Sequence, residues 1–282
     1  MNYDLEQVFC EFSQKGYVLV PDVFGQDEVL AFAEHFEAML SRGGDGWAEG
    51  GVDPESSDPL RRYPRFLQPH RGDAKSLQFM IDPRLRKLMT ACLGKTPLAV
   101  QTMYYFKPPG ARGQALHQDQ SYLRAEPGTC IAAWLAVDDC DDENGCLQVV
   151  PGTQGLPVLC PVKADMDKSF SGDMTPLPPG LEPINIHMRA GDVLFFNGSL
   201  VHGSGPNRSA TRFRRSLIGH YIEAQAEQVA QYYFPVYTFD GEVVERQPYV
   251  ADGGGPCGTM QVVDGEMQIT MDGTLAAARA AH

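Results

Sequence analysis

Two histidines and a carboxylate stand out among the residues that could do chemistry. His117 and Asp119 are separated by one residue, and His202 follows much later in the chain. In an extended strand, residues i and i+2 point to the same face, so His117 and Asp119 can present an imidazole and a carboxylate to one metal ion. With His202 from a neighbouring strand they would form a 2-His-1-carboxylate facial triad, which leaves positions open for oxygen and a cosubstrate. Because the set has no thiolate, it favours iron(II) or another divalent transition ion over structural zinc.

A chelating 2-oxo acid at such a metal would bring a second carboxylate that needs a buried cation. Arg214 begins an apolar strand, and its guanidinium could enter the interior and bind a carboxylate through two parallel hydrogen bonds. Ser204 lies two residues after His202 and would face the same side as that histidine. Two rival cations flank this position: Arg212 precedes the strand, and Arg215 falls on the face opposite to Arg214.

These residues need a scaffold, and the apolar pattern predicts a helical N-terminal part followed by a β-rich remainder. Three helices are expected, over residues 4–15, 26–41 and 83–93. From about residue 97 to 222, short apolar strands alternate with Gly and Pro turns, which is typical of an antiparallel double-sheet barrel. The strand that carries the metal pair is expected over 114–122. Residues 42–58 are predicted as a loop and 161–182 as a long insertion.

Composition limits the class of protein and its partners. The chain of 282 residues is 43% hydrophobic and 21% charged, as folded globular proteins are. Its net charge of −13 argues against nucleic acid and membrane surfaces as partners. We therefore expect a small-molecule substrate and a monomer or homodimer. No apolar run approaches the roughly 20 residues of a membrane span, and the N-terminus lacks a signal-peptide pattern. The seven scattered cysteines contain no CxxC pair, which favours reduced thiols and a cytoplasmic location.

Further motifs follow one another in a defined order through the β-rich region. They are Thr102-Met103 through Lys107-Pro108-Pro109, Leu116-His117-Gln118-Asp119, Trp134, Asn144-Gly145-Cys146-Leu147, Val150-Pro151-Gly152-Thr153, Gly191-Asp192, His202-Gly203-Ser204 with Asn207, and Phe213-Arg214. This ordered set resembles the phytanoyl-CoA dioxygenase family of iron(II)/2-oxoglutarate-dependent oxygenases. The resemblance covers about residues 97–222, and the N-terminal helix–strand–helix pattern also fits.

The resemblance implies a mainly β fold with flanking helices and a double-stranded β-helix (jelly-roll, cupin-like) core. It implies one oxygenase domain, with N-terminal helices and a strand over 1–96, the jelly roll over about 97–222 and a C-terminal extension over 223–282. The iron ligands and catalytic residues it implies are His117, Asp119 and His202. The residues it implies for 2-oxoglutarate are Arg214, Ser204, Trp134, Met103 and Gln118. Molecular oxygen would be the other cosubstrate.

The expected reaction is the oxidation of a small-molecule metabolite, most simply a hydroxylation, with decarboxylation of 2-oxoglutarate to succinate and CO2. Asp119 favours hydroxylation over halogenation, because halogenases that resemble this family replace the carboxylate with a small residue. Desaturation, epoxidation or ring rearrangement would use the same oxidant and stay open. Two other interpretations are a non-enzymatic jelly-roll protein that binds a metabolite and a cupin-like metal-dependent hydrolase or isomerase.

The substrate itself is not identified by this resemblance. Gln154 stands where the family usually has a histidine, and the segments 42–76 and 161–182 do not align with the family. His220 shares strand parity with Arg214, and we expect it to be a core histidine. The tail after about residue 244 is expected to end in a short alanine-rich helix and has no assigned function.

Overall fold

The computed structural model describes residues 3–250, 254–264 and 266–280. Its helices are α1 (Leu5–Lys15), α2 (Gln26–Ser41), α3 (Pro59–Arg62), α4 (Ala74–Met80), α5 (Pro83–Leu93), α6 (Gln120–Leu123) and α7 (Leu275–Ala280), with the 3-10 turns η1 (Pro69–Arg71) and η2 (Gln231–Tyr233). None of the helices in these ranges is long and apolar enough to cross a membrane.

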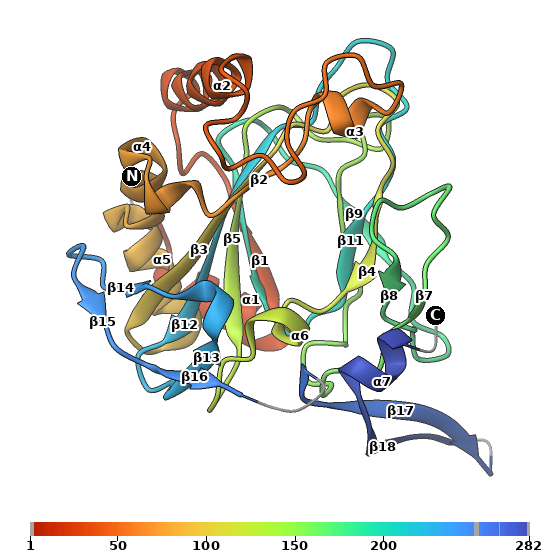
Figure 1. Cartoon of the computed structure of the whole chain (residues 1–282). Helices are drawn as coiled ribbons and strands as arrows, with labels where there is room; N and C mark the ends of the chain where they lie inside the picture. Colours follow the sequence, from red (N-terminus) through yellow and green to blue (C-terminus); the bar gives the residue numbers. More distant parts are fainter. Residues whose placement is uncertain (1–2, 251–253, 265, 281–282) are drawn as a thin grey trace.

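The strands of the larger sheet are β1 (Tyr17–Val20), β2 (Phe66–Leu67), β3 (Pro97–Tyr105), β5 (Cys130–Ala136), β10 (Val193–Asn197), β12 (Ser216–Glu223), β14 (Val236–Tyr237) and β15 (Val243–Val244). Their order is β1-β10-β5-β12-β3-β14-β15, with β2 paired to β3. The smaller sheet contains β4 (Gln114–His117), β6 (Leu147–Val149), β9 (Ile184–Ile186) and β11 (His202–Ser204). Its order is β4-β11-β6-β9, and both sheets are antiparallel. The two facing sheets form the expected jelly roll (Figure 1).

Strand β5 shows why the two sheets and the helices pack in layers. All of its residues are buried, so the strand has a hydrophobic run rather than an alternating pattern. Ile131, Ala133 and Leu135 face a core that they share with helices α1, α2, α4 and α5. The intervening residues Ala132 and Trp134 face the second core, between the two sheets. Side chains of β5 that face the smaller sheet are therefore the ones that can reach the jelly-roll interior.

Capping residues explain where the N-terminal helices begin and end. The side chain of Asp4 accepts a hydrogen bond from the backbone N–H of Gln7 and caps α1, which stops at Gly16 in the left-handed conformation (φ 75°). Helix α5 begins at Pro83 and stops at Gly94 (φ 63°). These boundaries and those of α2 confirm the helices expected from the apolar spacing.

Two segments differ from their expected structure. The strand expected over 114–122 ends at His117, and the chain turns into α6. The insertion over 161–182 contains a small hairpin, made by β7 (Val162–Lys163) and β8 (Asp173–Met174). Local sequence does not reveal these changes, because both are set by what the segments pack against.

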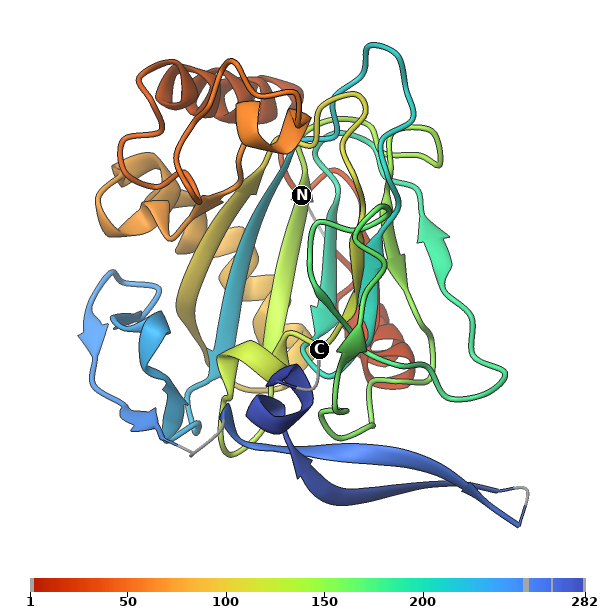
Figure 2. The same ribbon diagram turned by 45° about the vertical axis from the view of Figure 1, so that its right-hand side comes forward.

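The C-terminal extension is more structured than its composition suggests. Strands β13 (Gln228–Ala230) and β16 (Gln247–Tyr249) pair in parallel, and β17 (Pro256–Val263) pairs with β18 (Glu266–Thr274). The β17–β18 hairpin projects from the body of the molecule, and the expected short helix, α7, folds back beside α6 (Figure 2).

A disulfide joins this extension to the jelly roll. Cys160 and Cys257 are bonded across 97 residues of sequence, so the expectation of reduced thiols is wrong for this pair. Isolated cysteines far apart in the chain carry no pairing signal, and only the fold brings them together. The remaining cysteines are free.

Replacing Cys257 with serine is expected to lower the free energy of unfolding by about 2–4 kcal/mol under non-reducing conditions, because the bond restricts a long loop of the unfolded chain. Denaturant unfolding measures the change. Cys10→Ser removes an exposed free cysteine and is the matched control. Equal stability of the parent with and without a thiol reductant would contradict this bond.

Candidate metal centre and cosubstrate pocket

The three residues of the expected triad meet where β4 ends and β11 begins. His117 and His202 are paired across these strands. Gly203 permits the close approach, because a Cβ there would lie 2.7 Å from the carbonyl oxygen of Gln114. Asp119 lies beyond β4 in helical backbone (φ −61°, ψ −33°), at the start of α6. The turn into α6, rather than a continued strand, therefore places the carboxylate beside the two imidazoles.

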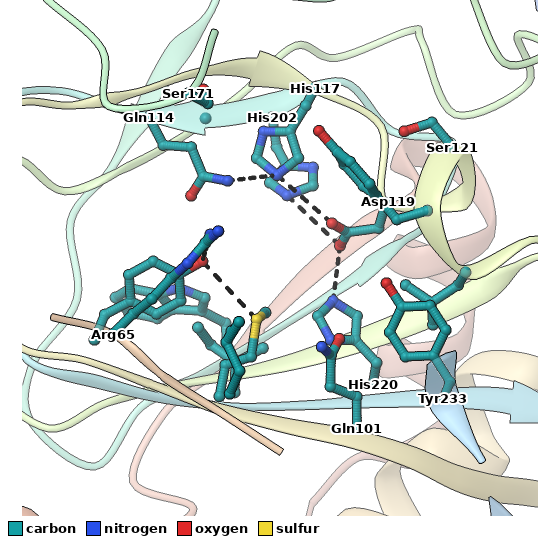
Figure 3. A pocket seen from close by; sticks show the side chains of 18 of the residues that line it. Arg65, Gln101, Gln114, His117, Asp119, Ser121, Ser171, His202, His220 and Tyr233 are labelled. Atoms are coloured by element: carbon teal, nitrogen blue, oxygen red, sulfur yellow. Dashed lines mark hydrogen bonds and ion pairs between the residues drawn. The ribbon is translucent and has the colours of Figure 1, made fainter. Parts of the chain in front are cut away.

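The donor atoms of this triad point toward one another (Figure 3). Nε2 of His117 lies 3.6 Å from Oδ1 of Asp119, and Nε2 of His202 lies 3.6 Å from Oδ2. The centroids of the two imidazole rings are 4.2 Å apart. One ligand atom from each of the three residues lies within 4.8 Å of the others, close enough to hold a single ion.

Backbone carbonyls determine which ring nitrogen of each histidine faces the cluster. Nδ1 of His117 lies 2.9 Å from the carbonyl oxygen of Ala115, and Nδ1 of His202 lies 3.0 Å from that of Leu200. A carbonyl can only accept, so Nδ1 carries the proton in both rings and Nε2 keeps its lone pair. Nε2 of both residues can therefore bind a metal ion.

The electrostatics of the triad suit a divalent cation. Burial alone raises the pKa of Asp119, but the neighbouring imidazoles of His202, His220 and His117, with the hydrogen bond from His220, outweigh it and hold that pKa well below its usual range. Burial lowers the pKa of His202 to about 4, against the opposing effect of Asp119. Near pH 7, Asp119 is anionic and His202 is neutral, which are the protonation states that metal binding requires. This donor set fits a divalent transition metal.

A third histidine supports the carboxylate. Nε2 of His220, on β12, donates a hydrogen bond to Oδ2 of Asp119 at 2.9 Å (Figure 3). The side chain is buried, and its Nδ1 has no hydrogen-bond partner among the residues described. Strand parity places His220 on the interior face, but nothing in the sequence shows its partner. Such a contact orients the carboxylate of a metal ligand.

The triad opens into a cavity of about 550 Å³ whose lining includes Met103, Trp134, Ser204 and Arg214. Arg214 is 3% exposed. Its Nε donates to the carbonyl of Gly145 (3.1 Å), a terminal nitrogen donates to the hydroxyl of Ser216 (3.0 Å), and the guanidinium lies 5.2 Å from the ring centroid of Trp134. These partners are all neutral, so the guanidinium keeps its capacity to bind a carboxylate.

Lys107 is a second buried cation, which reaches this end of the cavity through Ser204, and no pattern in the sequence marks it as a site residue. Its Nζ donates to the hydroxyl oxygen of Ser204 at 2.8 Å, and the residue is 3% exposed. Burial and then the charge of Arg214 lower the pKa of Lys107 well below its usual value. Its backbone has a left-handed conformation (φ 37°), which is unexpected for a residue that follows a regular strand.

Gln118 points away from the cavity. Its amide nitrogen donates to the carbonyls of Pro157 and Ser199, and its amide oxygen accepts from the N–H of Leu159. As the residue between His117 and Asp119 it faces the opposite side of the chain, where it holds two loops together. Its side chain is not among those that line the cavity.

The rival arginines are also engaged elsewhere. Arg212 forms ion pairs with Asp141 and Glu143 at the surface. Arg215 pairs with Asp138 and with Glu37 of α2, on the outer side of the larger sheet. Of these three neighbouring arginines, Arg214 is the one whose guanidinium enters the cavity.

A jelly roll that holds two histidines and a carboxylate in the wall of a cavity with a buried arginine defines a class, the iron- and 2-oxoglutarate-dependent dioxygenases. The model of the phytanoyl-CoA dioxygenase (PhyH) family matches residues 12–216. The chain therefore belongs to the phytanoyl-CoA dioxygenase family.

The sequence identity to individual relatives is low. The peroxisomal phytanoyl-CoA dioxygenase of Rattus norvegicus is 24% identical over 233 residues, which cover 78% of this chain and 68% of the rat protein. Phytanoyl-CoA dioxygenase 1 of Oryza sativa subsp. japonica is 30% identical over 159 residues, 55% of this chain and 56% of the rice protein. Among solved structures, the epimerase SnoN in complex with Fe3+, alpha ketoglutarate and nogalamycin RO has a TM-score of 0.63 at 23% identity, over 79% of this chain and 85% of SnoN. At that identity the likeness shows a common fold.

Proposed function

We propose that this protein uses iron(II), 2-oxoglutarate and molecular oxygen to hydroxylate a small organic substrate. His117, Asp119 and His202 would hold the iron, and Arg214, Ser204 and Lys107 would hold the distal carboxylate of 2-oxoglutarate. The observation that carries the proposal is the meeting, in one cavity, of a metal-binding triad with the buried guanidinium of Arg214, which has only neutral partners, and with Ser204, which Lys107 contacts from behind. A dicarboxylate that chelates the metal would satisfy both at once.

When bound, iron with oxygen and 2-oxoglutarate supplies an oxidant that inserts one oxygen atom into a C–H bond of the substrate, while the other oxygen atom enters succinate and CO2 is released. The protein's own residues bind 2-oxoglutarate and orient it. The hydroxyl oxygen of Ser204 accepts a hydrogen bond from Lys107, which leaves its proton to be donated to a carboxylate. Trp134 and Met103 form an apolar wall that keeps water from this end of the cavity.

The same arrangement supports related outcomes. Asp119 occupies the position that a halide would need, so the triad favours oxygen transfer over halogenation. SnoN, which shares the fold, is described as an epimerase, so the fold alone does not choose the outcome after hydrogen abstraction. Hydroxylation is our proposal because it needs nothing beyond iron, the two cosubstrates and the substrate.

The test begins without oxygen. Adding iron(II) and then 2-oxoglutarate to the parent protein is expected to produce a weak visible absorption band. Admitting air with a panel of small metabolites is expected to release succinate at a rate that depends on the metabolite. Zinc(II) in place of iron(II) is the control and should give neither signal. Absence of the band, together with oxygen-independent turnover by zinc or manganese, would favour a hydrolase or isomerase instead.

A further inference from the structure

The cavity has a second end, beyond the metal triad and away from Arg214. Its wall is made by α6 and by the C-terminal extension, which contribute Tyr122, Arg124, Tyr249 and Arg279. Figure 1 shows α6, β16 and α7 gathered on this side of the jelly roll. Tyr233 joins the wall near Asp119 and His220 (Figure 3). An extension outside the jelly roll thus lines the part of the cavity that lies outside the proposed 2-oxoglutarate site.

Four arginines line the whole cavity, and their partners separate them into two groups. Arg65 pairs with Glu49, and Arg279 pairs with Asp173. Arg214 and Arg124 form no ion pair with a carboxylate in the part of the chain that the structure describes. The proposed function accounts for Arg214 as the anchor for 2-oxoglutarate. Arg124 is left as a cavity-lining cation without an assigned anion.

Arg124 is 5% exposed, and its contacts leave much of its hydrogen-bonding capacity unused. Both terminal nitrogens donate to one acceptor, the carbonyl oxygen of Pro256, at 3.2 Å. Its Nε is buried with no partner among residues 3–250, 254–264 and 266–280. Burial is the main reason that the pKa of Arg124 is lowered. A buried cation without a counter-charge is costly, and an anionic ligand would remove that cost.

The chain holds this guanidinium in place. Gly255 passes so close that a Cβ there would lie 2.9 Å from the guanidinium carbon of Arg124, and the ring centroid of Tyr249 lies 5.8 Å from that carbon. Arg124 itself has a left-handed backbone (φ 52°) at the end of α6, a conformation that costs free energy in a residue other than glycine. A fixed donor pays little entropy when it binds an anion.

Tyr122 lies between this end of the cavity and the metal triad. The ring centroid of Tyr122 lies 6.3 Å from that of His117, and the guanidinium carbon of Arg279 lies 5.4 Å from the same tyrosine ring. A small molecule lying along Tyr122 would therefore have one end near the triad and the other near the arginines. Tyrosine faces suit an aromatic or other apolar body.

We propose that the substrate is a small organic acid with an apolar body, whose carboxylate binds Arg124 with help from Arg279 while its body lies along Tyr122 toward the metal triad. This inference rests on the proposed function, because it assigns the end of the cavity that 2-oxoglutarate does not fill. The negative net charge of the protein concerns its outer surface and does not oppose a cationic site inside.

Binding of matched probes to the anaerobic iron–2-oxoglutarate protein tests this subsite. Benzoate is compared with benzamide, and 4-phenylbutyrate with 4-phenylbutanamide, by equilibrium titration. The 2-oxoglutarate is saturating, so its own site is filled. We expect at least one acid to bind about tenfold or more tightly than its amide, and Arg124→Gln to abolish that difference, since a charge-assisted hydrogen bond is worth roughly tenfold or more in affinity.

Arg246→Gln is the matched control. Arg246 also has a buried Nε without a partner among the described residues and also donates to backbone carbonyls, but it lies outside this cavity. It should keep the preference for the acid. A second measurement separates binding from packing: without probes, Arg124→Gln should melt at or above the temperature of the parent, whereas a purely structural role for Arg124 predicts a lower melting temperature.

Two results would overturn the subsite. One is a parent protein that binds neither acid better than its amide, and the other is an acid preference that survives in Arg124→Gln. The visible band of the iron–2-oxoglutarate pair is recorded in the same samples. Loss of that band in the parent contradicts the proposed function, whereas an intact band without acid preference contradicts only the subsite.

Discussion

The variant Asp119→Ala is expected to lose both stoichiometric iron(II) binding and substrate-dependent succinate formation. Asp119 is the carboxylate between two imidazoles, and no other member of the triad carries a negative charge. The variant also leaves His220 without its hydrogen-bond partner in a buried site. Loss of an indirect partner of a metal ligand typically costs 10–100-fold in affinity or activity. Loss of the ligand itself should cost more than 100-fold.

Metal content after dialysis and succinate release measure these two effects separately. Asp142→Ala is the matched control, because Asp142 is an exposed carboxylate that contacts His187 on the outside of the smaller sheet. That variant should keep both iron and turnover. An Asp119→Ala protein that retains one iron per chain and forms succinate at the parent rate would show that the triad is not the metal site.

The second large effect is expected at the Arg214 end of the cavity, in the variants Arg214→Met and Lys107→Met. Each removes a buried cation that the proposed 2-oxoglutarate carboxylate would contact. Charge-assisted hydrogen bonds contribute about 1.5–3 kcal/mol each. The KM for 2-oxoglutarate should therefore rise roughly 10–100-fold in either variant, with Arg214→Met the larger because a guanidinium can bind a carboxylate through two bonds.

These substitutions weaken the binding of 2-oxoglutarate, but they should raise the stability of the cosubstrate-free protein. Without 2-oxoglutarate, Lys107 and Arg214 are both buried with neutral hydrogen-bond partners, and burial and then the charge of Arg214 lower the pKa of Lys107. Methionine in place of Lys107 removes that repulsion, so the cosubstrate-free protein should melt at a higher temperature. Arg212→Met, which breaks only surface ion pairs, is the control and should leave the KM unchanged. A normal KM in Arg214→Met would contradict the proposed cosubstrate site.

Much of the fold could be predicted because its signals are local. The apolar spacing of α1, α2 and α5, with the capping residues Asp4, Gly16 and Gly94, depends only on neighbouring residues. The continuous hydrophobic run of β5 could be recognised as a buried strand for the same reason. The hairpin of β17 and β18 was not expected, although Met267, Ile269 and Met271 of β18 alternate with polar residues. Its strands are largely exposed and pair mainly with each other.

The site was predicted as a set of residue types and completed by geometry. Asp119 could be named from its spacing to His117, yet the expected extended strand is replaced by the turn into α6. Lys107 was not expected at the site, because the sequence Lys-Pro-Pro indicates only the end of a strand. Its hydrogen bond to Ser204 forms from a residue with a left-handed backbone. His220 was seen to face the interior, but its hydrogen bond to Asp119 joins residues 101 positions apart.

The family, the jelly-roll class and the residue types of the metal triad could be recognised from the chain alone, because ordered motifs and local periodicity carry that information. The folded molecule was needed to see which polar groups are buried without a counter-charge, how the disulfide ties the C-terminal extension to the jelly roll, and that this extension lines the cavity. The physical reason is that burial, charge pairing and contact across a cavity depend on distances between residues far apart in the chain, which no local pattern records. Arg124 is the clearest example. In the sequence it is an ordinary arginine after a tyrosine and a leucine, and in the fold it is a buried cation at the end of the cavity away from Arg214.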